Sequence, residues 1–148
     1  MKVSILGVLV GGMVDVVSSV ALGLPLAMYT AFNVPLEQRT GPHASAAVSA
    51  AMRGNHALYI TQLAIGLLCS ALGGYIAALI AKRHERLNGT LASWLCILMG
   101  IIGMAIGLDK DPLWEQILLL IASPVMAYIG GDLRLRQRMR QPKIPASV

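Results

Sequence analysis

The amino-acid sequence is poor in charged and aromatic residues. Only 13% of its 148 residues are charged and 5% are aromatic, whereas 56% are hydrophobic. Average soluble domains carry roughly a quarter charged residues, and charged side chains are needed to cover a surface that faces water. The shortage of charge therefore all but excludes a soluble globular fold. It predicts a protein whose main solvent is lipid.

Residues that bind metals or carry nucleophilic catalysis are also scarce. The three histidines, His43, His56 and His84, are far apart and have no ligand spacing. Cys69 and Cys96 form no C-x-x-C motif and are predicted to be small packing residues. No glycine-rich phosphate loop or nucleophile elbow is present. We therefore expect no enzyme, no metal and no other cofactor.

What the sequence does contain is long uncharged stretches. Residues 16–36, 54–81 and 87–108 are uncharged over 21, 28 and 22 residues, and about 20 residues suffice for a helix to cross about 30 Å of hydrocarbon. A fourth apolar stretch, residues 116–131, is shorter. We predict an all-α polytopic membrane protein, a bundle of four transmembrane helices over residues 1–133. The spans are about 3–30, 56–81, 88–108 and 112–132, and residues 134–148 form a basic cytoplasmic tail.

The connection over residues 33–55 is the only long loop. Its alanine-rich part, residues 43–53, is expected either to extend the second helix or to form a short surface helix. Asp111 and Pro112 have the residue types of a helix N-cap and first turn, so the fourth helix is expected to begin there.

The distribution of basic residues predicts the orientation, because Lys and Arg are retained on the cytoplasmic side. Three of them, Arg39, Arg53 and Lys110, fall on one side of the predicted spans. Nine fall on the other: Lys2, Lys82, Arg83, Arg86, Arg134, Arg136, Arg138, Arg140 and Lys143. We expect a multi-pass protein of the bacterial inner membrane with both termini in the cytoplasm.

A cleaved signal peptide is the alternative interpretation of the N-terminus. Lys2 precedes an apolar run, and Ser19, Val20 and Ala21 resemble a cleavage site. Asp15 argues against it, because this acid would interrupt the apolar core that a signal needs.

Small residues recur at spacings of about four in every predicted span. Such ridges let helix backbones approach closely, which drives helix association in lipid. They predict a compact bundle, but they do not distinguish contacts within one chain from contacts between chains. The glycines expected at these contacts are Gly7, Gly11, Gly66, Gly74, Gly103, Gly107 and Gly131.

Asp15 is the one ionisable residue deep within a predicted span. It lies near the bilayer midplane, where insertion of an Asp costs about 2.5–3.5 kcal/mol. Ser19 is one turn further along, and Ser70 and Ser123 are expected at the same depth. We expect Asp15 to face the bundle interior, to bond Ser70 or Ser123 and to be protonated much of the time. It is either a proton- or cation-coupling carboxylate or a polar clamp between helices.

Two resemblances concern the architecture. Four helices with one acid midway along the first are similar to the small multidrug transporters, but the acid here is Asp, the flanking pattern differs and the first loop is longer. Residues 73–89, GGYIAALIAKRHERLNG, resemble the hairpin of uncharacterised small four-helix bacterial integral membrane proteins. That resemblance implies membrane location and topology only.

The C-terminal run has Arg at every second position from Arg134 to Arg140. This alternation does not make an amphipathic helix, and each basic residue near the surface gains about 1 kcal/mol from anionic lipid. The run is therefore interpreted as an anchor to anionic lipid headgroups, and docking of a cytoplasmic partner is the alternative. We expect no nucleic-acid partner.

Together these features favour a small integral membrane protein with a structural or accessory role. Its partners would be the lipid bilayer and, through the small-residue faces, its own copies or a larger membrane protein. The alternative is a small oligomeric transporter or channel that uses Asp15 for coupling, with Pro25 and Pro124 as flexible points.

Overall fold

The computed structural model describes residues 3–40, 43–82, 84–105 and 113–140, and every element in these ranges is an α-helix. The helices are α1 (Ile5–Phe32), α2 (Leu36–Arg39), α3 (Ala44–Gly54), α4 (His56–Ala81), α5 (Glu85–Ala92), α6 (Trp94–Ala105) and α7 (Leu113–Arg140). The predicted start of the last helix at Asp111 and Pro112 lies outside the described residues.

Three long apolar helices indicate a membrane-embedded protein. They are α1, α4 and the part of α7 from Gln116 to Arg140, each long and apolar enough to cross a membrane. A bundle of four spanning helices is not confirmed. The predicted third span, residues 88–108, is divided at Ser93 between α5 and α6, and the described part of α6 has 12 residues.

Ser93 explains this division. Its backbone N–H bonds the carbonyl of Thr90 at 3.2 Å, and its hydroxyl donates to the same carbonyl at 2.8 Å. Both bonds tighten the end of α5 and replace the regular bond four residues back, as serine hydroxyls can do. An uncharged stretch long enough to span therefore forms two shorter helices.

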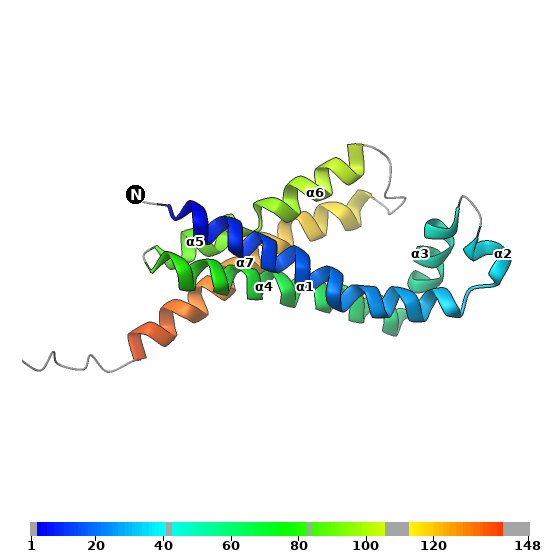
Figure 1. The fold of residues 1–148 in the computed structure, drawn as a ribbon, viewed down its shortest axis with the longest axis horizontal. Helices are drawn as coiled ribbons and strands as arrows, with labels where there is room; N and C mark the ends of the chain where they lie inside the picture. The colour runs from blue at the N-terminus through cyan, green and yellow to red at the C-terminus, as the bar shows by residue number, and fades with distance from the viewer. Residues whose placement is uncertain (1–2, 41–42, 83, 106–112, 141–148) are drawn as a thin grey trace, which may run out of the picture.

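The helices gather at one end of the molecule, whereas towards the other end α6 and the first half of α7 lean away from α1 and α4 (Figure 1). Figure 1 shows α1 and α4 side by side and antiparallel, with α7 crossing α4 obliquely. We call the end that holds the start of α1, the α4–α5 connection and α5 the hairpin end. The short helices α2 and α3 lie at the opposite ends of α1 and α4, and α3 is the separate short helix that was one of two expectations for residues 43–53.

The burial pattern is the reverse of that in a soluble protein. Fully buried positions include small residues such as Ala77 and Ala127, both 0% exposed, whereas Ile5 and Phe32 are 75% and 72% exposed. Soluble monomers rarely expose contiguous apolar surface on this scale. Large side chains on the outside and small ones inside are expected where the surrounding solvent is lipid.

Glycines hold α4 against both of its long neighbours. A Cβ on Gly11 of α1 would lie 2.6 Å from the carbonyl oxygen of Gly73 in α4, and one on Gly74 would collide with the backbone of Ala127 in α7. Gly7 and Gly131 are also at close backbone contacts, with Ala77 and Glu85. These four glycines lie where the sequence predicted tight packing, and the contacts are within one chain.

Gly66 makes no such contact within the described chain, because a Cβ there would have nothing within 4 Å. Gly107 lies outside the described residues, as does the packing around Gly103. Other close contacts were not predicted, because a single four-residue ridge cannot describe a helix that contacts neighbours on two sides. These contacts involve Gly12, Gly73, Gly89 and Gly130.

A buried asparagine joins α1 to α5 at the hairpin end. Asn88 is 0% exposed, and its Oδ1 accepts a hydrogen bond from the backbone N–H of Ser4 at 2.8 Å. Ser4 is also the N-cap of α1, since its Oγ accepts from the N–H of Gly7 at 3.2 Å. The backbone N–H groups of Ser4 and Gly7 both have acceptors, and one side chain of α5 holds the start of α1 in place.

Ion pairs join the end of α7 to the same region. Arg138 donates to Glu85 Oε1 and to the carbonyl oxygen of Lys82, both at 2.5 Å, and Asp132 pairs with Arg86 and Arg136 at 2.6 Å. Three of the basic residues expected at the membrane surface thus bind acids of this chain. Lys82, Arg134 and Arg140 form no ion pair among the described residues, Arg83 lies outside them, and α7 continues as a helix through Arg140.

The glycine contacts can be tested with a matched pair of alanine variants. Gly11→Ala places a Cβ against the backbone of Gly73, so we expect the free energy of unfolding to fall by about 1–3 kcal/mol, as for overpacked cores. Gly66→Ala should be neutral or stabilise by up to about 1 kcal/mol through helix propensity. Thermal unfolding of both variants in the same detergent measures the difference, and equal midpoints would contradict the packing described here.

The Glu85–Arg138 pair should make stability depend on pH. Burial disfavours the charged Glu85, but hydrogen bonds from its own backbone N–H and from Arg138 outweigh this effect and hold the pKa of Glu85 below its ordinary value of 4.5. Since the folded-state pKa is lowered, the stabilisation is present above pH 4.5 and is lost as the pH falls through the folded-state value.

The measurement compares the unfolding midpoints of the native chain and Glu85→Gln across this pH range. The native chain should be the more stable at neutral pH, and the difference should shrink as the pH drops below 4.5. Glu37→Gln, on α2, serves as the control. A difference between the native chain and Glu85→Gln that does not change with pH would show that the charge of Glu85 is not responsible.

Candidate functional site

A cavity of about 260 Å³ lies between α1, α4, α6 and α7. It is found where α6 and the first half of α7 lean away from α1 and α4 (Figure 1). Its polar lining comprises Asp15, Ser19, Ser70, Cys96, Gln116 and Ser123, and its remaining lining comprises Gly66, Leu67, Ile97, Gly100, Leu119 and Leu120. The helices α4, α6 and α7 each contribute both polar and apolar residues to this lining, and α1 contributes Asp15 and Ser19.

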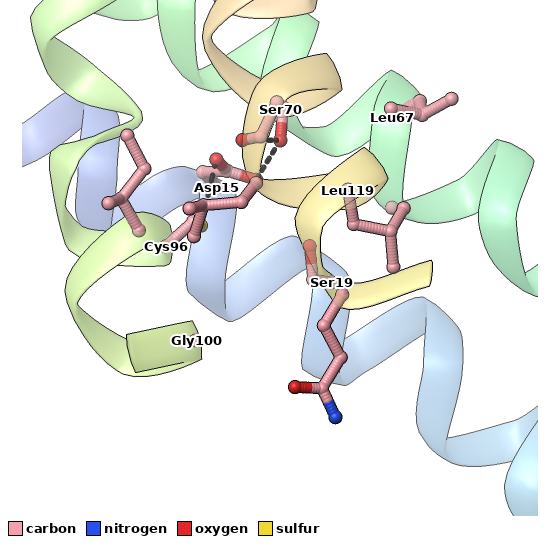
Figure 2. Close-up of a pocket in the computed structure, with 12 residues that line it drawn as sticks. Asp15, Ser19, Leu67, Ser70, Cys96, Gly100 and Leu119 are labelled. Carbon is pink, nitrogen blue, oxygen red and sulfur yellow. Dashed lines mark hydrogen bonds between the residues drawn. The ribbon is translucent and has the colours of Figure 1, made fainter. Parts of the chain in front are cut away.

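Asp15 of α1 lies in the wall of this cavity. Its side chain is buried, with only 1% of the residue exposed, and both carboxylate oxygens accept hydrogen bonds. The Ser70 hydroxyl donates to Oδ1 at 3.3 Å, and the Cys96 thiol donates to Oδ2 at 3.1 Å. Figure 2 shows the three side chains converging from α1, α4 and α6. The expected bond between Asp15 and Ser70 is thus confirmed.

Ser123 of α7 extends this contact. Its Oγ lies 3.0 Å from the Oγ of Ser70. A hydroxyl has only one proton, so Ser123 donates to Ser70 when Ser70 donates to Asp15. A protonated Asp15 can reverse the chain, since each hydroxyl then accepts from one neighbour and donates to the next. These partners can serve both protonation states of the carboxyl group, which a lysine or arginine partner could not do.

The two serines that follow Asp15 have different positions. Ser19 lines the cavity one turn further along α1 (Figure 2). The Ser18 hydroxyl bonds the carbonyl of Val14 in its own helix. Ser19, Ser70 and Ser123, the serines named from the sequence, are therefore all at the site.

The cavity lining is acidic without a basic counterpart. Among the residues that line it, Asp15 is the one formally charged side chain, and none is Lys, Arg or His. The described ion pairs lie between α5 and α7 or within α7, and none involves a residue of the cavity lining. A buried carboxyl group without a basic partner must be neutral or have a cation beside it.

The two glycines in the lining provide space. A Cβ on Gly66 would meet nothing within 4 Å, and one on Gly100 would be at an ordinary 3.6 Å from Leu120. Both positions could carry a larger side chain without a backbone collision. Gly66, expected at a helix contact, instead forms part of the cavity wall.

Two residues at the site were not predicted to take part in it. Cys96 was predicted to be a small packing residue, but its thiol donates a hydrogen bond to the carboxyl group of Asp15. Gln116 lies near the start of the last apolar stretch and lines the cavity. Its polarity within an apolar helix was the available signal. In the described part of the chain, no group of three or more His, Cys, Asp and Glu could hold a metal ion.

Comparison with known proteins yields no match among protein-family models, curated proteins or solved structures. The resemblances noted in the sequence therefore stay predictions, and the role of the site must be inferred from its geometry.

The bonding around Asp15 predicts a mild effect of Asp15→Asn on folding. The amide oxygen can still accept from Ser70, so the variant should lose less than about 1 kcal/mol. Asp15→Leu keeps a similar shape but removes both bonds, and it should cost about 0.6–1.7 kcal/mol for each bond lost, as measured between membrane helices. Unfolding midpoints in detergent give the ranking. Aggregation of Asp15→Asn, with Asp15→Leu well folded, would contradict it.

Proposed function

We propose that this protein is a small, non-enzymatic integral membrane transporter in which Asp15 binds a proton or a cation. The observation that carries the proposal is the cavity of about 260 Å³ beside a buried carboxyl group that has no basic residue in the cavity lining. Ionisable residues at such depth commonly mark ion and proton pathways. The hydroxyl and thiol partners of Asp15 suit a group that gains and loses a proton.

The contacts that the small residues make within the chain favour transport over a purely structural role. Gly7, Gly11, Gly74 and Gly131 contact helices of their own chain, so these faces are occupied and are not open to a partner. A polar clamp would also need only close packing around Asp15, whereas the site contains a cavity.

Proline supplies a flexible point next to the site. Pro124 lies within α7 directly after Ser123, and it lacks the N–H that would bond the carbonyl of Leu120 in the cavity wall. A helix can bend at such a position. Pro25 interrupts α1 in the same way further from the site. We propose that α7 bends at Pro124 when the cavity opens.

For location we propose the bacterial inner membrane, with the hairpin end and both termini in the cytoplasm. The excess of Lys and Arg on that side supports this orientation, because acidic neighbours contribute little to the positive-inside rule. Pairing of Arg86, Arg136 and Arg138 with acids therefore leaves the prediction intact. Lys82, Arg134 and Arg140 are the proposed contacts with anionic headgroups.

A structural or accessory role is the second candidate function. The observation that favours it is the row of large exposed apolar side chains on the long helices, including Leu68, Leu72 and Ile121. A partner helix could cover these side chains in place of lipid.

Flux measurements in vesicles test the proposal. The full chain is reconstituted in liposomes that contain a pH-sensitive dye, and gradients of protons, Na⁺ and K⁺ are applied in turn. We expect protein-dependent proton or cation flux that Asp15→Asn reduces to the level of protein-free vesicles. Glu37→Gln, which removes an acid of α2 outside the cavity lining, should retain the native rate. Flux that persists in Asp15→Asn would contradict the role of this residue.

A further inference from the structure

We propose that one anionic phospholipid binds at the hairpin end, with its phosphate group at Lys82 and Arg138 and an acyl chain along the exposed face of α4. Such a lipid is a bound ligand with a defined site, unlike the lipid that merely surrounds the helices. Its binding does not require transport. Three features carry it: the free donors of Arg138, a local excess of positive charge, and an apolar stripe that ends at this charge.

Arg138 has hydrogen-bond donors that are not used within the chain. Its bonds to Glu85 Oε1 and to the carbonyl oxygen of Lys82, both at 2.5 Å, come from the same nitrogen, Nη1. A guanidinium group carries five N–H donors, and the side chain of Arg138 is 54% exposed. In the described part of the chain, the N–H groups of Nε and Nη2 have no acceptor. They form the fork that can bind two oxygens of a phosphate group.

Positive charge is in excess around these donors. Arg138 contacts the backbone of Lys82, so the exposed Lys82 side chain starts from the same place. Arg134 lies one turn before Arg138 on α7, and its charge also acts on the Glu85 carboxylate. Neither Lys82 nor Arg134 forms an ion pair with another described residue. These three basic residues, the cationic cluster, thus share one carboxylate, and the remaining charge favours an anionic headgroup.

An apolar stripe on α4 leads to the cationic cluster. It consists of side chains three or four residues apart, which share one face of a helix: Leu68, Leu72, Tyr75 and Leu79. The three leucines are 64%, 47% and 39% exposed. Lys82 follows Leu79 at the same spacing, so the stripe ends at a basic residue. A phospholipid supplies both a phosphate group and an apolar chain, whereas an apolar partner helix would leave the cationic cluster without a counterpart.

The stripe has the length of an acyl chain in one leaflet. Leu68 and Leu79 are 11 residues apart, which is about 16 Å along a helix at about 1.5 Å per residue. Half of the hydrocarbon core is about 15 Å, so a chain beside the stripe reaches from the cationic cluster to about the bilayer middle. The Tyr75 hydroxyl donates to Gln137 Oε1 at 2.7 Å and joins the stripe to α7 directly before Arg138. Headgroup donors and chain surface therefore meet at one place.

Native mass spectrometry of the full chain in nonionic detergent tests the proposal with dioleoyl phosphatidylglycerol. We expect saturable binding of one lipid per chain. The controls are dioleoyl phosphatidylcholine, which has the same chains without net charge, dihexanoyl phosphatidylglycerol, which has the same headgroup on short chains, and inorganic phosphate, which has no chain. Each should bind at least about fivefold more weakly, the contribution of a single basic residue near the membrane surface.

Two variants with the same change of charge separate a site from general attraction. Lys82→Gln should weaken binding of dioleoyl phosphatidylglycerol about fivefold. Arg140→Gln removes an equally exposed charge at the end of α7, about 200° around the helix from Arg138, and should leave the affinity unchanged.

Arg138 is tested together with Glu85, because removing Arg138 alone would leave a buried carboxylate without its partner. Glu85→Gln keeps the guanidinium group and should retain or strengthen lipid binding. The double variant Glu85→Gln with Arg138→Gln should abolish it. Because these residues do not line the cavity, the result is independent of the flux measurement.

Several outcomes would overturn the proposal. Equal binding of phosphatidylcholine, or equal losses in Lys82→Gln and Arg140→Gln, would reduce it to general attraction between charges. Native affinity in the double variant would exclude Arg138. A mass of two chains without lipid would show that a second copy covers the stripe instead.

Discussion

The close backbone approach of α4 to α1 and α7 is the constraint on which the rest of the structure depends. Lipid gives little hydrophobic drive for helix association, so the helices gain stability where their backbones can touch. Gly11 and Gly73 allow this contact between α1 and α4, and Gly74 and Gly130 allow it between α4 and α7. Because the contacts between α4 and α7 lie in the half of α4 nearer the hairpin end, the first half of α7 is free to lean away from α4 (Figure 1).

The candidate site lies between the region where α4 and α7 are in close backbone contact and the region where α7 leans away from α4. A Cβ on Gly73 would be 2.8 Å from the Cβ of Asp15, so this glycine makes the room in which the carboxyl side chain sits. One turn before it, Ser70 reaches Asp15 by a hydrogen bond, and a turn earlier Gly66 faces open space. The same helix thus supplies a close contact, a hydrogen-bond donor and a cavity wall in successive turns.

Several features were predictable because they depend on local composition. Uncharged stretches of sufficient length predicted α1 and α4, and the depth of Asp15 along its helix placed it level with Ser70, to which it bonds. The break at Ser93 was not predictable from hydropathy, since it falls inside residues 87–108, an uncharged stretch long enough to span a membrane. The connection from α4 to α5 was also not evident. Lys82 and His84 adopt left-handed backbone with φ of 54° and 50°, a conformation usually supplied by glycine.

The sequence by itself determined the solvent of this protein and the residue that most needs explanation, because the cost of placing charge in lipid depends on residue type and depth alone. Only the tertiary structure decided which small residues touch and which leave space. Gly66 and Gly74 have the same chemistry and spacing in the sequence, yet one borders a cavity and the other meets the backbone of Ala127. That difference is set by the angle at which α7 crosses α4, which depends on all the contacts of both helices together.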